Sequence, residues 1–307
     1  MNQDVDRLLQ LIGEGNPFQK QYIEKMRNEV MGRREYENLE FLTGFFCAQG
    51  ISVEQQAEAY SAFGNAFMEE QLYFRRNHKY SKNNYREICQ AVYENNEYMS
   101  RYMVALAISG CIWSDHIHIL RWYEEEIKSV CKNKINNYLE IGCGMGINML
   151  HTMQATNAKK YQAADLSEKS VELSKTLLAY AKEKGLLSGK EYTVKCKDFF
   201  AFMPEEKADV FTMFEVLEHV PNPKEMLERI KYVTTENAEI FVSTAINSPA
   251  PDHIYLFRNT NEIVNMIKDC GFSVENMLCA PSNGVTLEIA ERKELPITIA
   301  LRLKRKN

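Results

Sequence analysis

Apolar side chains recur at helical spacing through the first 130 residues of this chain. One stripe contains Leu8, Leu9, Leu11 and Ile12, and a second contains Tyr22, Ile23, Met26 and Val30. The pattern continues over residues 40–46 and ends near Gly50, and Ser52 with Gln55 predicts a capping box for a helix reaching about residue 75. Further helices are predicted near residues 83–94 and 97–131. Residues 1–131 therefore predict an all-α domain.

After residue 132, short apolar runs alternate with helical segments, a pattern typical of an α/β domain over residues 132–307. A helix is predicted from Asn222, with Pro223 at its first position and Glu225 closing a capping box. The predicted strands are Tyr138–Ile141, Lys160–Ala164, Tyr192–Cys196, Ala208–Phe214, Glu239–Thr244, Phe272–Leu278 and Ile297–Leu303.

Three glycines at alternate positions follow the first of these runs, which ends with Glu140 and Ile141. Gly142, Gly144 and Gly146 let the backbone turn sharply and approach a ligand. The preceding Glu140 can hold a polar ligand group such as an ammonium. The spacing differs from the G-x-G-x-x-G of a nicotinamide site because the third glycine arrives one residue early. A plain tight turn gives the same pattern, so the residues around the loop must distinguish a ligand-binding loop from a simple turn.

Asp165 follows the glycine loop at the end of the second predicted strand. In a Rossmann-like unit, an acid about 20 residues beyond the glycines accepts both ribose hydroxyls of a nucleotide. The same residue, followed by Leu166, Ser167 and Glu168, is also placed to cap the next helix. Together with the glycine loop, the position favours the ribose role.

Two sequence motifs resemble those of a known family. The E-x-G-x-G-x-G form of residues 140–146 resembles motif I of class I S-adenosylmethionine (SAM)-dependent methyltransferases, and the string from Phe214 to Val220, FEVLEHV, resembles the post-strand-four motif of ubiquinone-type small-molecule methyltransferases. The resemblance covers about residues 136–304. It implies a Rossmann-like seven-stranded sheet with an antiparallel last strand, and SAM as the cofactor.

The resemblance also implies which residues contact the cofactor. Asp198 would accept a hydrogen bond from the adenine amino group and Phe199 would pack on the ring; the alternative is a capping Asp and a core Phe. The full predicted set is Glu140, Gly142, Cys143, Gly144, Gly146, Asp165, Leu166, Asp198, Phe199, Phe214 and Glu215.

No family motif reaches the N-terminal domain, which we expect to cap the SAM site because its apolar helices would otherwise be exposed. Aromatic and imidazole side chains gather in residues 98–125 and suggest substrate specificity, although packing explains them equally well: Tyr102, Trp113, His116, His118 and Tyr123. Residues two apart on a helix point about 200° away from each other, so His116 and His118 do not predict a shared metal. No metal site is expected.

Two histidines are candidates for the base that removes a proton from the methyl acceptor. His219 follows the fourth strand, and His253 lies in the loop that follows the fifth strand, near Asp252 and Tyr255. Imidazole titrates near neutral pH, but a structural hydrogen bond is an alternative for each. With Tyr102 from the cap, they make up the predicted catalytic set.

Composition narrows the class of partner. A net charge of −5 argues against a broad nucleic-acid-binding face. Eight scattered cysteines, with no C-x-x-C pair and no signal peptide, predict reduced thiols in a cytoplasmic protein. The longest apolar run, Met103–Trp113, is too short to span a bilayer. A small-molecule substrate is expected, and a homodimer is compatible with these features.

The sequence thus predicts a methyltransferase acting on a small molecule, with two alternatives left open. Some enzymes with this core attack the aminobutyryl carbon of SAM instead, transferring that group or cyclising SAM to azetidine-2-carboxylate with release of methylthioadenosine. The other alternative is a SAM-binding subunit without catalysis. The acceptor atom is not evident from the sequence.

Overall fold

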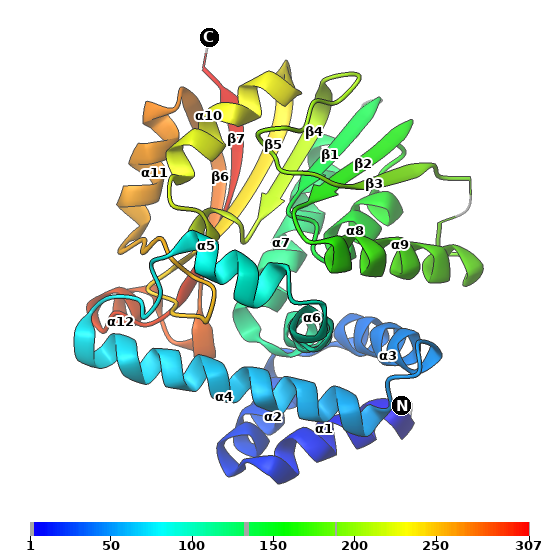
Figure 1. Ribbon diagram of the computed structural model, residues 1–307, viewed down its shortest axis with the longest axis vertical. Coiled ribbons are helices and arrows are strands. Elements are labelled where there is room, and N and C mark those ends of the chain that lie inside the picture. Colours follow the sequence, from blue (N-terminus) through cyan, green and yellow to red (C-terminus); the bar gives the residue numbers. More distant parts are fainter. Residues whose placement is uncertain (1–2, 132–134, 188, 307) are drawn as a thin grey trace.

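Seven strands form one sheet in the described part of the chain, residues 3–131, 135–187 and 189–306, in the order β3-β2-β1-β4-β5-β7-β6. β7 pairs antiparallel with β5 and β6, whereas β1 to β5 pair in parallel. The computed structural model therefore confirms the predicted α/β fold and its antiparallel last strand (Figure 1). The strands are β1 (Asn137–Ile141), β2 (Lys160–Asp165), β3 (Tyr192–Cys196), β4 (Ala208–Phe214), β5 (Thr234–Ile246), β6 (Phe272–Pro281) and β7 (Ile297–Arg305).

Helices cover both faces of the sheet, which explains why its inner strands are continuous apolar runs. Along β1, Leu139 and Ile141 join the core cluster of α10 and α11, and Tyr138 joins the cluster of α7 (Ser114–Val130), α8 and α9 on the other face. The helices that follow the strands are α8 (Ile147–Ala155), α9 (Glu168–Glu183), α10 (Pro223–Val233), α11 (Thr260–Asp269) and α12 (Leu287–Arg292). The predicted capping box of α10 is wrong, because the Asn222 side chain makes no cap hydrogen bond.

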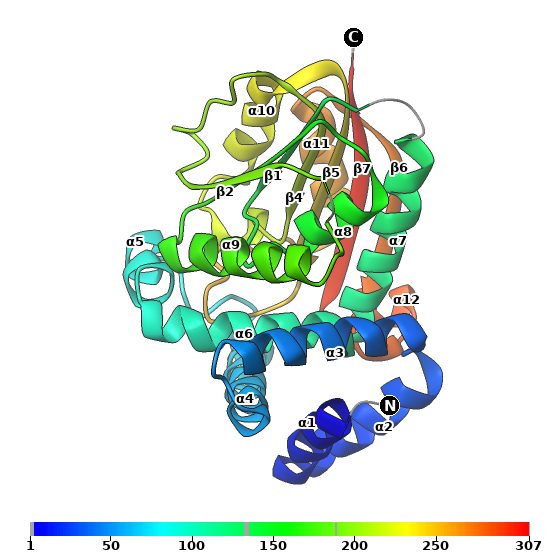
Figure 2. The ribbon, with the colours of Figure 1, turned by 90° about the vertical axis from the view of Figure 1, so that its right-hand side faces the viewer.

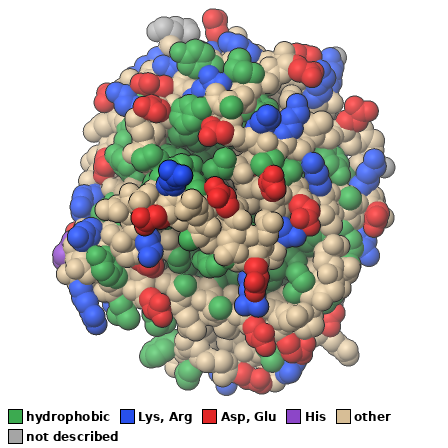
Figure 3. Space-filling model, in the orientation of Figure 1, with side chains coloured by type: hydrophobic (Ala, Val, Ile, Leu, Met, Phe, Trp, Pro, Cys, Tyr) green, Lys and Arg blue, Asp and Glu red, His purple; other side chains and the backbone are tan. Residues whose placement is uncertain are grey.

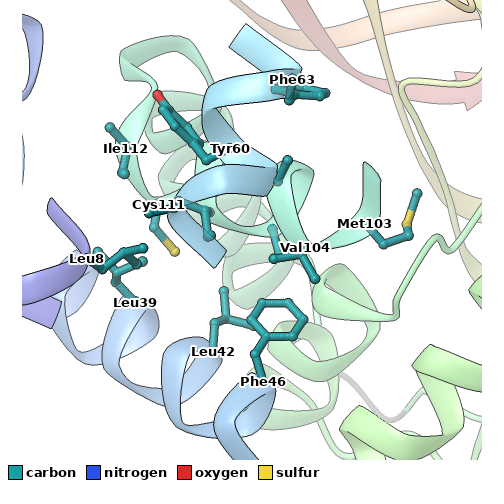
Figure 4. Packing of buried hydrophobic residues seen from close by; sticks show 14 of the residues in the cluster. Leu8, Leu39, Leu42, Phe46, Tyr60, Phe63, Met103, Val104, Cys111 and Ile112 are labelled. Atoms are coloured by element: carbon teal, nitrogen blue, oxygen red, sulfur yellow. The ribbon is translucent and has the colours of Figure 1, made fainter. Parts of the chain in front are cut away.

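The N-terminal helices pack around α6, as Figure 4 shows for Leu8, Leu39, Tyr60 and Cys111. They are α1 (Gln3–Gly15), α2 (Pro17–Glu29), α3 (Arg33–Ala48), α4 (Val53–Asn77), α5 (Tyr85–Ile88) and α6 (Asn96–Ile112). The capping box at Ser52 is confirmed. The single helix predicted over 83–94 is instead α5 followed by a π-helical turn, Cys89–Tyr93.

The long helix predicted over 97–131 is also wrong, because the chain turns at Trp113 and continues as α7 (Ser114–Val130). Trp113 has extended backbone angles, and tertiary contacts hold the turn: its indole Nε1 donates to Tyr60 Oη over 2.9 Å, and Ser114 N donates to Tyr22 Oη over 3.1 Å. In the described residues no single helix is long and apolar enough to cross a membrane; α6 and α7 meet that test only together, bent by 76°.

Helix α7 packs along the sheet and also contacts the cap, where Arg121 pairs with Glu35 of α3. The Tyr123 ring lies edge-on to Phe214 of β4, at 4.9 Å, and to Phe241 of β5, at 5.3 Å. Figure 2 shows α7 running beside β6 and β7. We therefore propose that the boundary between cap and sheet domain lies before Ser114 rather than after residue 131.

The cap lies across the carboxyl ends of the parallel strands (Figures 1 and 2). Its α3 meets α9 where Phe41 and Phe45 pack on Tyr180, with ring centroids 5.4 and 5.6 Å apart. The strand order reverses between β1 and β4, and in open α/β sheets ligands bind at such a switch point. Basic and acidic side chains are interspersed on the face shown in Figure 3; the absence of a nucleic-acid partner stays a prediction.

Candidate functional site

The glycine-rich loop after β1 forms one wall of a cavity. Gly142 and Gly144 have φ of 72° and 53°, which glycine adopts without steric cost. A Cβ on Gly142 would lie 2.3 Å from Cγ2 of Val216, whereas one on Gly144 would have only Met103 Sδ nearby, at 3.8 Å. Gly142, Cys143 and Gly144 line the cavity. The backbone of this loop is therefore open to a ligand.

Two residues of the predicted cofactor set, Gly146 and Glu140, lie behind this wall. Gly146 begins α8 with φ of 83°, and a Cβ there would lie 3.0 Å from Ser174 Oγ. Glu140 is 1% exposed and interacts with Tyr138 Oη and with Asn148 at the start of α8. Burial raises the pKa of Glu140 to about 8. Since Asn148 lines the cavity, Glu140 is placed to orient Asn148, and the geometry does not support the predicted direct contact of Glu140 with an ammonium group.

Asp165 lies at the end of β2 and lines the cavity together with Leu166. Its Oδ2 accepts a hydrogen bond from Gly144 N, and its Oδ1 accepts one from Ser167 N, both over 2.9 Å. Burial raises the pKa of Asp165. Each carboxylate oxygen accepts more than one hydrogen bond, so Asp165 can fix the glycine loop and still receive a ligand's hydroxyl groups. The alternative in which Asp165 caps the next helix is wrong, because Ser167 is the N-cap of α9 and accepts from Ser170 N; the ribose role stays a prediction.

Asp198 and Phe199 follow β3 and line the same cavity. Asp198 Oδ1 accepts a hydrogen bond from Phe200 N over 2.7 Å, which closes a tight turn. Phe199 is buried, and its ring centroid lies 6.1 Å from that of Phe211. The turn thus presents a carboxylate beside an aromatic ring, the pairing expected for an adenine pocket.

Phe214 and Glu215, at the end of β4, complete the predicted cofactor wall. Glu215 has φ of 52°, an uncommon conformation for a residue with a side chain. Ser243 holds it: the Glu215 amide donates to Ser243 O over 3.1 Å, and Ser243 Oγ donates to Glu215 Oε1 over 2.7 Å. Burial raises the pKa of Glu215. The strained turn directs this carboxyl group toward the cavity.

The cavity has a volume of about 1430 Å³, which exceeds the roughly 300–1,000 Å³ of ordinary ligand pockets. The sheet domain supplies the loops described above, and the cap supplies aromatic and apolar side chains opposite them. Those cap residues include Phe63, Phe67, Tyr102, Met103, Leu106 and Trp113. The space is large enough for a cofactor and a second molecule side by side.

A buried carboxylate, Asp252, joins the cap to the sheet domain at this cavity. It is 1% exposed and accepts hydrogen bonds from Tyr102 Oη, at 3.1 and 3.3 Å, and from Tyr93 Oη, at 3.3 Å. Nδ1 of His219 lies 3.0 Å from Tyr93 Oη and 3.1 Å from the Asp252 carbonyl oxygen. The structure therefore brings predicted residues Tyr102 and His219 together through Asp252.

No sequence pattern indicates Tyr93, which lies in the π-helical turn. For Asp252 the sequence indicates only a position beside His253 in the loop after β5. Burial and the Asp252 carboxylate raise the pKa of Tyr102 well above 10, so its hydroxyl remains a hydrogen-bond donor.

His253 adjoins the same cluster. Its Nδ1 lies 2.6 Å from the Ser248 carbonyl oxygen, and its ring is nearly perpendicular to that of His219, with centroids 4.7 Å apart. Burial lowers the pKa of His253 to about 3, so the ring is neutral near pH 7. Both predicted histidines line the cavity.

The remaining aromatic and imidazole residues of 98–125 lie in three different places. Trp113 and His116 line the cavity, with ring centroids 5.1 Å apart. His118 is exposed, and Tyr123 is buried on the sheet. The prediction that Tyr102 and Trp113 share the last helix before the sheet domain is wrong, since Tyr102 lies on α6 and Trp113 at the turn after it.

Comparison with known proteins places this site in a family. Residues 116–274, just over half of the chain, match the family described as "Methyltransferase domain". The chain therefore belongs to this family of methyltransferases, and its cofactor is SAM. The matched segment begins within α7, which agrees with the packing of that helix on the sheet.

Among curated proteins, the chain is similar to ubiquinone biosynthesis O-methyltransferases. The protein of Histophilus somni (strain 2336) is 28% identical over 131 residues, 41% of this chain and 50% of that protein. That of Coxiella burnetii (strain RSA 493 / Nine Mile phase I) is 25% identical over 149 residues, 48% and 58% respectively. The chain thus spans about half the length of the curated relatives it matches.

Two solved structures show the same fold. Magnesium protoporphyrin IX methyltransferase from Synechocystis PCC 6803, with bound SAM, has a TM-score of 0.54 and 16% identity, covering 74% of this chain and 99% of that one. Mitomycin 7-O-methyltransferase has a TM-score of 0.51 and 15% identity, covering 82% and 70%. At these identities the likeness concerns the fold alone.

Proposed function

We propose that this protein transfers the methyl group of SAM to a small molecule held beneath the helical cap. The observation that carries the proposal is a single cavity of about 1430 Å³ whose wall includes both the glycine loop and the Asp252 cluster. One end of the cavity is suited to the cofactor, and the other, enclosed by the cap, is suited to an acceptor.

SAM lies in this proposal along the carboxyl ends of β1 to β4. Asp198 and Phe199 receive the adenine, Asp165 and Leu166 the ribose, and the glycine loop the methionine part, near Cys143. Phe214 and Glu215 flank the sulfonium. Support comes from the free acceptor capacity of Asp165 and from the open backbone at Gly144.

The reaction requires an acceptor atom, the methyl carbon and the sulfur in line. The acceptor's lone pair forms the new bond to carbon, the carbon–sulfur bond breaks, and S-adenosylhomocysteine leaves with that electron pair. An acceptor hydroxyl must also lose a proton. His219 is the candidate that takes up this proton, whereas burial lowers the pKa of His253 to about 3 and makes it a poor base near pH 7. The cap residues opposite the cofactor wall reduce the access of water to the reacting atoms.

A small acceptor fits the enclosed site, and the similarity to ubiquinone biosynthesis O-methyltransferases supports an oxygen atom as the acceptor. The cytoplasmic location and the homodimer remain predictions.

The nucleoside product that the protein forms from SAM tests the proposed chemistry. We expect the full-length protein, incubated with SAM and a cell extract, to form S-adenosylhomocysteine, identified by mass spectrometry, and to form no nucleoside product with SAM alone. Asp165→Ala is the matched control and should lower the yield under the same conditions.

Methylthioadenosine formed from SAM alone would contradict methyl transfer and indicate attack on the aminobutyryl carbon. SAM binding without any product in extracts that support other methyltransferases would indicate a non-catalytic subunit. Neither result would change the assignment of the cofactor wall.

Removal of the cap provides a further prediction. A protein of residues 114–307, which keeps α7 on the sheet, should fold and bind SAM weakly but show no turnover. A protein of residues 135–307 should be poorly soluble, because loss of Tyr123 exposes Phe214 and Phe241. Circular dichroism, calorimetry with SAM and product analysis compare the two. Full turnover by residues 114–307 would show that the cap is an unrelated module.

A further inference from the structure

A second buried carboxylate, Asp115, lies on the cavity wall outside the set of residues assigned to the cofactor. It belongs to the first turn of α7 and is 5% exposed. Its Oδ2 accepts hydrogen bonds from Ser282 Oγ over 2.9 Å and from Thr298 Oγ1 over 3.2 Å. Within residues 3–131, 135–187 and 189–306, no hydrogen bond reaches its Oδ1. Because all three residues line the cavity, Oδ1 is available to a molecule bound there.

The position of this carboxylate is fixed and close to the reacting end of the proposed cofactor. Ser282 lies in the 3-10 turn after β6 (Ser282–Gly284), and Thr298 lies in β7, so two elements of the sheet domain hold one oxygen of Asp115. Burial raises the pKa of Glu215, and the Asp115 charge adds to that rise. Asp115 is therefore near Glu215, which flanks the sulfonium in the proposed arrangement.

Aromatic rings line the cavity beside Asp115. Trp113 stands two positions before it, and the ring centroids of Phe63 and Phe67 lie 5.5 and 5.4 Å from that of Trp113. All of these rings are on the cavity wall. The face of an aromatic ring attracts a cation within about 6 Å of its centroid, most strongly for tryptophan. Rings next to a carboxylate thus suit a positively charged group.

Basic side chains of the protein do not neutralise Asp115 in the described part of the chain. Of those on the cavity wall, Arg34 and Lys128 pair with Glu124. The others lie at the end of α9 and after β3: Lys184 and Lys197. A buried carboxylate is normally paired with a charge as well as hydrogen-bonded. The group that completes this pairing is expected to come from the bound molecule.

We propose that Asp115 binds a positively charged nitrogen of the methyl acceptor, which is then a hydroxylated small molecule carrying an ammonium or similar cation. This inference rests on the proposed function, because it takes the molecule beneath the cap to be the acceptor. The rings of Phe63, Phe67 and Trp113 pack on the body of that molecule, and Asp115 holds its charged end. An ammonium nitrogen has no lone pair, so it anchors the substrate and leaves the hydroxyl oxygen to attack the methyl carbon.

Binding of three related phenols to the full-length protein, saturated with S-adenosylhomocysteine, tests the site. Tyramine carries a cation, para-ethylphenol is neutral, and para-hydroxyphenylpropionate carries an anion on a chain of similar length. We expect calorimetry to show tyramine binding roughly 10- to 150-fold more tightly than para-ethylphenol, the range for a hydrogen bond between charged groups, and the anion binding most weakly. In Asp115→Asn, whose amide oxygen still accepts from Ser282 and Thr298, tyramine should bind no more tightly than para-ethylphenol.

Glu125→Gln is the matched control, because Glu125 is exposed on the same helix and is not among the residues that line the cavity. It removes the same charge and should keep the preference for tyramine. Thermal melts and SAM affinity establish that both variants fold. Equal or tighter binding of para-ethylphenol, no binding of any of the three phenols, or a preference for tyramine retained in folded Asp115→Asn would overturn the site.

The site and the proposed function can fail separately. Selective binding of tyramine without S-adenosylhomocysteine formation from SAM in cell extracts would sustain the Asp115 site and contradict the proposed function. Formation of S-adenosylhomocysteine by a protein that binds the three phenols without regard to charge would leave the proposed function standing and overturn the Asp115 site.

Discussion

Gly144→Val is expected to abolish SAM binding in a protein that still folds. A Cβ at this position points into open space beside Met103 Sδ, 3.8 Å away, and the valine methyl groups would occupy the volume proposed for the methionine part of SAM. The φ of 53° also adds strain, on the order of 1–2 kcal/mol for a residue with a side chain. Calorimetry with SAM and a thermal melt measure the two effects separately.

Gly50→Val is the control for strain. Gly50 has φ of 81°, nothing lies within 4 Å of its added Cβ, and it is not among the residues that line the cavity. It should lower the melting temperature and leave SAM affinity unchanged. Normal SAM affinity in folded Gly144→Val would contradict the placement of the cofactor along the glycine loop.

Asp165→Ala should weaken SAM binding without abolishing it, as measured by the same calorimetry. Losing a charge-assisted pair of hydrogen bonds costs about 1.5–3 kcal/mol, which corresponds to roughly 10- to 150-fold in affinity. Because Asp165 also accepts from Gly144 N and Ser167 N, Asp165→Asn is the companion variant: it keeps one acceptor oxygen for the loop. Unchanged affinity in folded Asp165→Ala would contradict its ribose role.

The residues of the cofactor wall could be predicted from the sequence because each of them lies in a short segment with a local pattern. Gly142 follows β1, Asp165 is the last residue of β2 and Asp198 lies two residues after β3, and parallel strands end at one edge of a sheet. Local spacing therefore sufficed to place them on one wall. Glu140 and Gly146 belong to the same motif but lie behind the wall, because side-chain direction within the motif depends on packing against α8 and α9.

The acceptor half depends on contacts between distant segments, which local patterns do not encode. Tyr93 meets Asp252 from 159 residues away, and its direction is set by a π-helical turn that the apolar spacing of 83–94 did not indicate. Glu218 belongs to a motif that the sequence shows, but its hydrogen bond from Thr244 forms only once β4 and β5 lie side by side. The break at Trp113 likewise depends on hydroxyl groups of Tyr60 and Tyr22.

Loss of both tyrosine hydroxyls at Asp252 should impair turnover more than cofactor binding. Tyr93 and Tyr102 come from the cap and donate to one carboxylate of the sheet domain, so they hold the closed arrangement over the acceptor. In Tyr93→Phe/Tyr102→Phe, Asp252 keeps its charge in a buried position without these donors. A hydrogen bond to a charged group contributes about 1.5–3 kcal/mol. We therefore expect the rate of S-adenosylhomocysteine formation to fall roughly 10- to 150-fold, with SAM affinity nearly unchanged.

Tyr60→Phe separates this effect from general loss of stability. Tyr60 is 1% exposed and lies within the cap, where its hydroxyl accepts from Trp113 Nε1 over 2.9 Å. The substitution removes the same atom from a buried site that does not touch the sheet domain, so it should lower the melting temperature but retain most of the turnover. If Tyr60→Phe slows turnover as much as the double variant at equal loss of stability, the Asp252 cluster only holds the fold. If the double variant alone loses turnover, the junction between cap and sheet domain positions the acceptor for methyl transfer.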